Sequence, residues 1–280
     1  MREVSVDRIQ AAVVECIERA AFELDARVVS ALQAARDQET SSVARTVLEE
    51  LLQNQRIARE ERRPMCQDTG TAVLFVELGQ EVHLVDGDLR SAVDDAVHEG
   101  YTRHRLRAGM VGHPLSRENT TDNTPAMLHV RLAPGNRVRI RFMAKGGGCE
   151  NMNRLAMLTP AQGREGVLAF VEESVRSAGG RPCPPVVVGV GLGGTFERTA
   201  ELAKEALLRP LGDPAARDED AALEAEALAR INALGVGPMG LGGRTTALAV
   251  HVESTGCHIA SLPVAVNLDC HAHRHAEAVL

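Results

Sequence analysis

Aromatic side chains are nearly absent from this sequence, which has five Phe, one Tyr and no Trp among 280 residues. Proteins that bind single-stranded nucleic acid commonly stack bases on aromatic rings. With so few rings and a formal net charge of -7, a nucleic-acid-binding surface is not expected. The core must instead be built from aliphatic residues, and a hydrophobic content of 44% is ample for one.

Long apolar runs are missing as well. No stretch of about 18 apolar residues occurs, which excludes a membrane-spanning helix by length. Residues 1–7 lack the basic segment followed by an apolar stretch that is typical of a secretion signal. We therefore expect a cytoplasmic protein with no membrane partner. In that compartment the six cysteines would be reduced thiols or metal ligands.

The hydrophobic pattern predicts an α/β (mixed α+β) fold. Residues 7–62 carry apolar side chains at helical spacing, for example Ile9, Val13 and Ile17. Alternating and continuous apolar runs then predict strands at 72–78, 127–132, 137–143, 186–190, 246–252 and 259–266, with helices at 88–104, 164–177, 196–208 and 221–234. We expect a helical N-terminal region of about residues 1–62, then mixed sheets flanked by helices, in a single domain spanning 1–280.

Three cysteines stand in distinctive surroundings. Cys66 lies in the segment Pro-Met-Cys-Gln-Asp-Thr-Gly, Cys183 between prolines, and Cys270 in Asn-Leu-Asp-Cys-His. A four-iron cluster that transfers electrons takes four thiolates, whereas three thiolates leave one iron able to bind substrate. An open metal position is typical of Lewis-acid catalysis. The three cysteines therefore suggest an iron-sulfur enzyme.

Glycine-rich segments have two interpretations. Residues 189–194 and 235–240 match the dinucleotide-binding fingerprint, but no second strand ends in an acidic residue about 20 residues after the first match. We therefore do not expect NAD. A third segment, 145–151, adds backbone amides beside a lysine. Such loops either bind an anion through their N–H groups or merely permit tight turns and close packing.

Several of these segments occur together and in order. They are residues 66–72, 119–125, 144–148, 189–195, 240–246 and 260–265. This set resembles the class I (iron-sulfur) fumarate hydratase family over essentially the whole chain. The resemblance is to the α half of that family, and it implies an iron-sulfur hydro-lyase α-domain. Family members with separate subunits include fumarases and L(+)-tartrate dehydratases, and this chain is similar to their α subunit.

The resemblance implies a cofactor and two catalytic residues. Cys66, Cys183 and Cys270 would hold a 4Fe-4S cluster whose fourth iron meets the substrate. Asp68 is similar to the family residue that donates a proton during dehydration. His258 matches an active-site histidine of the family.

Substrate-binding residues follow from the same resemblance. Gln67 would hydrogen-bond to the substrate, and Arg107 would pair with a substrate carboxylate through its forked guanidinium. Lys145 and the amides of Gly147 and Gly148 would bind further oxygen atoms.

The implied reaction is the reversible addition or removal of water on a four-carbon dicarboxylate, either fumarate/malate or tartrate/oxaloacetate. Removing water from such a 2-hydroxy acid requires loss of a weakly acidic C–H proton and departure of hydroxide, and metal binding to the hydroxyl eases both steps. The family's catalytic base lies in the half that this chain lacks. We therefore expect a β subunit as partner, in an assembly of two α and two β chains.

The C-terminal region departs from the family pattern and leaves one alternative open. His271 and His273 stand where small or hydroxyl residues are usual. The resulting pattern is Cys270-x-x-His273-x-His275, which we interpret as lying beside Cys257 and His258. Thiolate and imidazole suit zinc. The alternative is a non-catalytic iron-sulfur or zinc-binding regulatory protein. Zinc would leave the segment around Cys66 and the glycine loops unexplained, and any role of Cys149, Cys257, His271 and His273 stays open.

Overall fold

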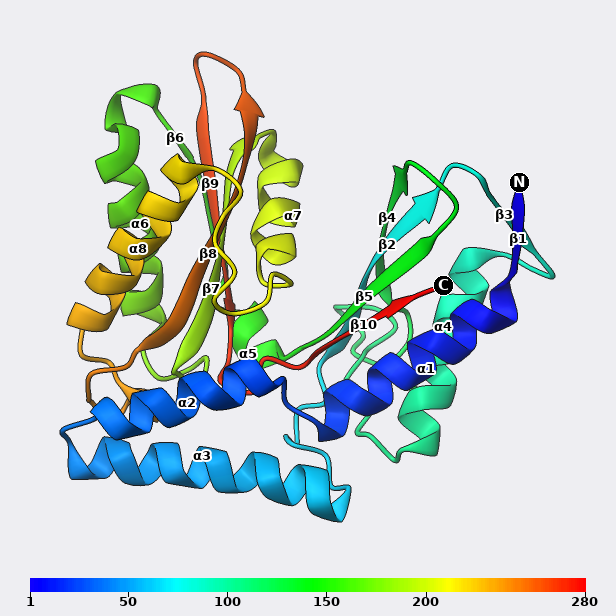
Figure 1. Ribbon diagram of the computed structural model, residues 1–280, viewed down its shortest axis with the longest axis horizontal. Coiled ribbons are helices and arrows are strands. Elements are labelled where there is room, and N and C mark those ends of the chain that lie inside the picture. Colours follow the sequence, from blue (N-terminus) through cyan, green and yellow to red (C-terminus); the bar gives the residue numbers. More distant parts are fainter. The chain divides into compact units, whose positions relative to one another are not determined.

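The computed structural model describes all 280 residues. The chain divides into two compact units (Figure 1). Unit 1 comprises Met1–Leu24, Gln55–Gly147 and Arg274–Leu280, and unit 2 comprises Asp25–Asn54 and Gly148–His273. A division by packing does not say whether the two units fold separately, so the expectation of a single α-subunit domain stays a prediction.

Unit 1 is built on a four-stranded sheet with the order β10-β5-β2-β4. Strand β2 is parallel to β4 and antiparallel to β5, and β5 is antiparallel to β10. Strands β1 and β3 form a separate parallel pair. The bounds are β1 (Arg2–Ser5), α1 (Val6–Phe22), β2 (Thr71–Gly79), β3 (Val82–Val85), α4 (Leu89–Arg103), β4 (Met127–Ala133), β5 (Val138–Lys145) and β10 (His275–Val279).

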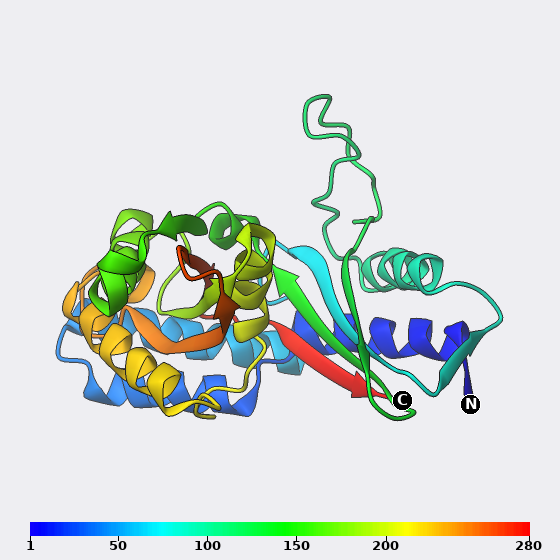
Figure 2. The same cartoon turned by 90° about the horizontal axis from the view of Figure 1, so that it is seen from above.

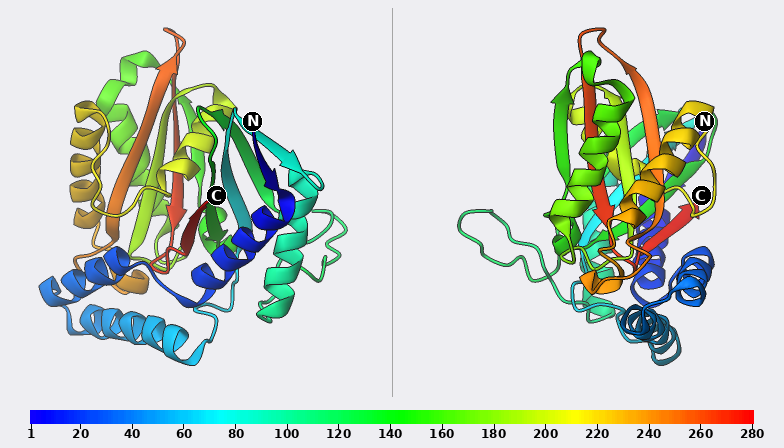
Figure 3. Two further views of the ribbon diagram at one scale, coloured as in Figure 1. Left: turned by 45° about the vertical axis from the view of Figure 1, so that its right-hand side comes forward. Right: turned by 90° about the vertical axis from the view of Figure 1, so that its left-hand side faces the viewer.

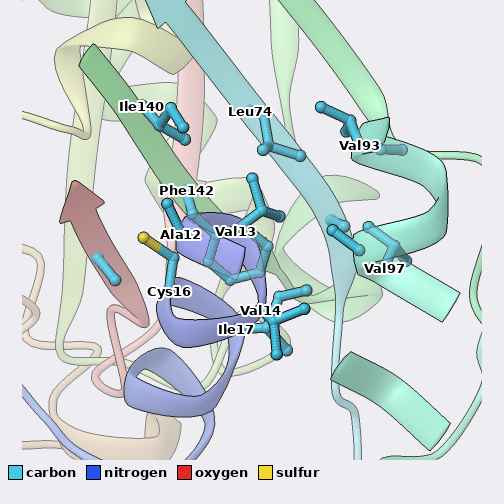
Figure 4. Packing of buried hydrophobic residues seen from close by; sticks show 14 of the residues in the cluster. Ala12, Val13, Val14, Cys16, Ile17, Leu74, Val93, Val97, Ile140 and Phe142 are labelled. Atoms are coloured by element: carbon cyan, nitrogen blue, oxygen red, sulfur yellow. The ribbon is translucent and has the colours of Figure 1, made fainter. Parts of the chain in front are cut away.

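The core of unit 1 lies between its sheet and helices α1 and α4 (Figure 4). In α1, Val13 and Ile17 are four residues apart and fully or almost fully buried, because positions at this spacing share one helix face. They pack with Leu74, Ile140 and Phe142 of the sheet. Helix α1 is capped by the Ser5 hydroxyl and α4 by the Asp88 carboxylate, each of which accepts a backbone N–H of the first turn.

A long excursion joins α4 to β4 in unit 1 (Figure 2). It contains a bridge between Val111 and Asn119, and its tip carries Leu115, which is 86% exposed. Arg107 lies near its start and Asn123 near its end. Arg107 therefore belongs to this loop and not to helix α4, which ends at Arg103.

Unit 2 contains a second four-stranded sheet, with the order β6-β9-β7-β8. Strand β7 is parallel to β8 and antiparallel to β9, which is antiparallel to β6. The bounds are α2 (Ala26–Gln38), α3 (Ser42–Glu61, which continues into unit 1), α5 (Gly147–Glu150), β6 (Arg154–Leu158), α6 (Gly163–Ala178), β7 (Val186–Gly194), α7 (Phe196–Ala206), α8 (Asp218–Ala233), β8 (Ala247–Cys257) and β9 (Leu262–Asp269), with 3-10 turns at Pro160–Gln162 and Pro238–Gly240.

Helices cover both faces of the unit 2 sheet (Figure 3). Helices α6 and α8 pack on the face that carries Val186, Val188 and Val190 of β7. Helix α7 packs on the other face, where β7 carries glycine. A Cβ on Gly189 would lie 2.1 Å from the carbonyl oxygen of Ala203, and one on Gly191 would lie 2.1 Å from that of Thr199. At these two positions the packing interpretation is confirmed, because only glycine lets the helix approach so closely.

The α/β class and the helical N-terminal region are confirmed by this architecture. The predicted helices and longer strands are all present, with ends shifted by a few residues. Strands β1, β3, β6 and β10 were not predicted; each has four or five residues, too few to show a period. No helix of the structure combines the length and apolarity needed to cross a membrane.

Candidate active site

The segment 64–70 forms a loop of unit 1 that leads into β2. Cys66 is half-buried and Gln67 is exposed, and the Cys66 thiol donates to the Gln67 amide oxygen at 3.5 Å. The Asp68 carboxylate accepts two backbone N–H groups, from Gly70 at 3.0 Å and from Gly147 at 2.7 Å. The carboxylate is therefore oriented by its surroundings rather than left to rotate.

Buried side chains from distant parts of unit 1 hold the backbone of this loop. Arg274 is 4% exposed and donates to the Asp68 carbonyl oxygen at 2.7 Å. The Tyr101 hydroxyl donates to the carbonyl oxygens of Thr69 and Gly70 at 3.0 and 3.1 Å. Burial raises the pKa of Tyr101, while the Arg274 charge opposes that shift, so the phenol stays protonated and can donate.

Asn123 connects the loop to the excursion that carries Arg107. It is fully buried; its side chain donates to the Gly70 carbonyl oxygen at 3.0 Å and accepts the Gly109 N–H at 2.7 Å. The Thr69 hydroxyl also donates to the carbonyl oxygen of Arg107. These bonds fix the start of the excursion beside the residue 64–70 loop and leave the Arg107 side chain exposed.

The segments 66–72 and 144–148, which the sequence singled out separately, meet at Gly70. This glycine has a φ of +78°, and a Cβ there would lie 2.7 Å from the Ala144 carbonyl carbon. No other residue fits, because the backbone is left-handed and the space is filled. Lys145, next to this contact, is 1% exposed, whereas Gly147 is exposed and its amide already serves Asp68.

Unit 2 brings two of the three predicted ligand cysteines to one end of its sheet. Cys183 precedes β7 and Cys270 follows β9, and these strand ends are paired through Val187 and Asp269. The Cys183 carbonyl oxygen lies 3.0 Å from Nδ1 of His271. Both cysteines are half-buried. Gly148 begins the unit 2 segment that approaches this end, and a Cβ on Gly148 would lie 3.4 Å from the Arg181 carbonyl oxygen.

A third thiol, Cys149, belongs to the same end of unit 2. The Cys149 Sγ, the Cys270 Sγ and a carboxylate oxygen of Asp269 all lie within 4.8 Å of one another. Cys149 is 4% exposed, Asp269 is 2% exposed, and Nδ1 of His273 lies 2.9 Å from the Asp269 carboxylate. Thiolates with a carboxylate are a donor set that could bind a metal ion.

His258 lies at the opposite end of this sheet. It follows β8, and Gly194 at the far end of β7 is paired with Cys257. Gly194 follows Val187 by seven residues, which is about 23 Å of strand at ~3.3 Å per residue. The alternative of a zinc site with Cys257 and His258 beside Cys270 is therefore wrong, because β7 and its paired strands separate the two groups. His258 is exposed, with its Nδ1 accepting the Ala260 N–H.

A cavity of about 570 Å³ lies at the His258 end of unit 2. Its lining includes Arg164, Asp220, Ser254 and Cys257. The cavity stands at the carboxyl ends of the parallel strands β7 and β8, the usual place for a ligand in an α/β sheet. The cysteine cluster is at the other end, so cavity position alone would not have identified it.

Sequence reasoning missed the residues that brace the site. Tyr101 and Arg274 were not singled out, and Asn123 and Asp269 occurred only as members of a motif. A signal existed for Tyr101, because a lone tyrosine in a chain so poor in aromatic residues suggests a use for its hydroxyl. No sequence signal links Arg274 to Asp68, which is 206 residues away.

The comparisons with known proteins agree with this arrangement of motifs. The family model described as fumarate hydratase (Fumerase) matches residues 10–279. A Methanocaldococcus jannaschii protein provisionally named L(+)-tartrate dehydratase subunit alpha is 40% identical over 275 residues, covering 96% of each chain. L(+)-tartrate dehydratase subunit alpha of Escherichia coli is 35% identical over 250 residues, covering 88% of this chain and 82% of that one, and the Shigella sonnei protein of the same name gives the same values.

The family match over nearly the whole chain and the names of these relatives define the class as a hydro-lyase enzyme. The chain belongs to the fumarate hydratase (Fumerase) family and corresponds to the α subunit of a hydro-lyase.

Proposed function

We propose that this chain is the α subunit of an iron-sulfur hydro-lyase that adds water to or removes it from a four-carbon dicarboxylate. The names of the relatives make L(+)-tartrate the first substrate to test and malate the second. The observation that carries the proposal is the residue 64–70 loop, where a candidate metal ligand, Cys66, and an oriented carboxylate, Asp68, are two residues apart.

Cys66, Cys183 and Cys270 are the residues that would hold a 4Fe-4S cluster. All three are half-buried thiols, which suits ligands that must be shielded and yet border a substrate site. When bound, the cluster would supply an open iron that polarises the substrate hydroxyl. The unit 2 end that gathers Cys149, Asp269 and Cys270 supports this donor chemistry.

The chain's own residues would bind the substrate and move a proton. Asp68 would give a proton to the leaving hydroxyl, since its position is fixed by the Gly70 and Gly147 amides. A carboxylate has about four lone-pair sites, so these two bonds leave room for the proton. Gln67 would hydrogen-bond to substrate, and Arg107 would pair with one carboxylate.

The remaining assigned residues have narrower proposed roles. Lys145 is buried, so its positive charge would attract the substrate carboxylate without direct contact. The Gly148 amide would bind a substrate oxygen, whereas the Gly147 amide would act through Asp68. His258 would be a catalytic residue, although Cys183 and Cys270 of the same unit lie at the other end of the sheet.

A β subunit would complete the site. The relatives are named as alpha subunits, and a dicarboxylate in a dry site needs cations at both ends. The base and the second set of cations would come from the β subunit, in a cytoplasmic assembly of two α and two β chains. The interface would be large and permanent, as in obligate complexes.

The test is anaerobic reconstitution with iron and sulfide, alone and with a co-expressed β-subunit candidate. We expect about four iron and four sulfide per chain, and turnover of tartrate or malate only with the partner. Cys66→Ser, Cys183→Ser and Cys270→Ser should each lose iron. Cys16→Ala is the control, because burial raises the pKa of Cys16 to about 12 and keeps it a thiol. A colourless zinc protein with full activity, or full turnover by the chain alone, would overturn the proposal.

A further inference from the structure

Cys149 is the one buried thiol near the candidate metal site to which the proposed function gives no role. It lies in the single turn α5 and is 4% exposed. Its thiol donates to the Pro182 carbonyl oxygen at 3.4 Å, so its sulfur is held beside the loop that carries Cys183. The other two unassigned cysteines are elsewhere, Cys16 in the apolar core of unit 1 and Cys257 at the far end of the unit 2 sheet.

Cys149 and Cys270 are neighbours within unit 2. Their sulfur atoms are within 4.8 Å of each other, so the side-chain movement that the proposal requires is the one that brings them to the ~2.05 Å of a disulfide. Both residues belong to unit 2, so no rearrangement of units is needed. We propose that Cys149 is the resolving thiol for Cys270, and that the two form a reversible disulfide when the metal site is emptied under oxidising conditions.

Exposure determines the order of the steps. Cys270 is half-buried and Cys149 is buried, so a peroxide reaches Cys270 first. The Cys270 sulfur attacks one oxygen of hydrogen peroxide, the O–O bond breaks, and a sulfenic acid and water form. The Cys149 sulfur then attacks the Cys270 sulfur, the S–O bond breaks, and the second oxygen leaves as water. Two thiols are oxidised by two electrons, and one peroxide is reduced to two waters.

The disulfide would have two consequences for the protein. It stops Cys270 at a state that a thiol reductant can reverse, since sulfenic acid left without a nearby thiol proceeds to irreversible sulfinic acid. It also withdraws Cys270 from metal binding, so iron could return only after reduction. This second consequence rests on the proposed function, whereas the disulfide itself does not.

The experiment uses the full chain, freed of iron by a chelator and reduced. After treatment with hydrogen peroxide, thiol titration should show the loss of two of the six cysteine thiols. Mass spectrometry of peptides under non-reducing conditions should show residues 149 and 270 linked, and dithiothreitol should restore both thiols. In Cys149→Ser, Cys270 should instead appear as sulfinic or sulfonic acid. Cys257→Ser is the matched control and should retain the link.

The outcomes separate this inference from the proposed function. A link from Cys270 to Cys183 or Cys66, or a Cys149 that stays reduced while Cys270 is over-oxidised, would overturn the inference. The same treatment of the iron-loaded protein tests the function. If the link forms equally fast with and without iron, the assignment of Cys270 as a ligand is wrong and the disulfide stands.

Discussion

At the scale of single residues, the candidate site depends on Asp68 being held in one orientation. One carboxylate oxygen accepts the Gly70 N–H and the other accepts the Gly147 N–H, and buried Arg274 anchors the backbone at the same residue. The Gly70 bond alone is common in turns, but the Gly147 bond comes from a residue 79 positions away and fixes the direction of the carboxylate. The proton-transfer role of this oriented carboxylate is the part of the proposal to be tested.

Replacing Asp68 by Asn tests this role. The variant should keep its iron but lose turnover by about 100-fold or more, the usual scale for a positioned acid or base. Asp95→Asn, an exposed carboxylate of α4, is the control for folding and should leave turnover unchanged. Near-normal turnover in Asp68→Asn, measured with matched iron content, would refute the assignment.

Glu39 shows the same principle in a structural role. It is 5% exposed, and its carboxylate accepts the N–H groups of Thr40, Ser41 and Arg244. Burial would raise its pKa, but the hydrogen bonds from Ser41, Arg244 and Thr40 outweigh burial and lower it. Within unit 2 this residue ties the turn between α2 and α3 to the glycine-rich segment before β8.

The lowered pKa gives Glu39 a predictable pH dependence. A carboxyl whose folded pKa lies below its unfolded value stabilises the fold above the unfolded pKa, and this contribution is lost as pH falls through the folded pKa. Glu39→Gln should therefore lower the free energy of unfolding by about 1–3 kcal/mol at pH 7. The difference should shrink below pH ~4.3, the ordinary pKa of glutamate. Exposed Glu49→Gln serves as control in denaturant titrations at both pH values; a pH-independent difference would contradict the explanation.

At the scale of elements, glycine in β7 determines where α7 packs. Gly189 and Gly191 face the helix, while the valines between and beside them face α6 and α8. The match to a dinucleotide fingerprint thus arises from alternation along a strand buried on both faces. The short distance between strand and helix, rather than a phosphate, accounts for these glycines.

Gly191→Ala should show this directly. Its Cβ would lie 2.1 Å from the Thr199 carbonyl oxygen, so α7 must move. Overpacking of this kind lowers the free energy of unfolding by about 1–3 kcal/mol. Gly256→Ala is the matched control in the same unit, because nothing lies within 4 Å of a Cβ there. Equal midpoints for the two variants in denaturant titration would show that the close contact at Gly191 does not affect the free energy of unfolding.

At the scale of the whole molecule, the unit 2 sheet places His258 and the Cys183–Cys270 pair at opposite ends. The register of β7 with β8 and β9 keeps them apart. We propose that His258 serves a site whose cysteines belong to another copy of the chain. This role agrees with the proposed assembly, which contains two α chains.

Mixed assemblies test whether His258 acts across copies. Cys270→Ser and His258→Ala should each be inactive or nearly so with the β subunit. Co-expressed together, random pairing of two α chains would give about a quarter of sites with both residues intact. Activity near half of the unmodified value is the expected result for assemblies purified through a different tag on each chain, because this purification keeps only the mixed pairs, in which one of two sites is intact. Absence of recovery, or a fully active His258→Ala, would contradict the role.

The sequence by itself determined the fold class, the order of the motifs and the family, because helical and strand periods and short motifs are local properties of the chain. It also named Cys66, Asp68 and Cys270 as candidates. It could not show that Arg274 and Tyr101 hold the Asp68 loop, that Cys149 lies beside Cys270, or that His258 lies far from it. Those relations depend on strand direction and register, which bring residues more than a hundred positions apart into contact and carry others, only twelve positions apart, to opposite ends of a sheet.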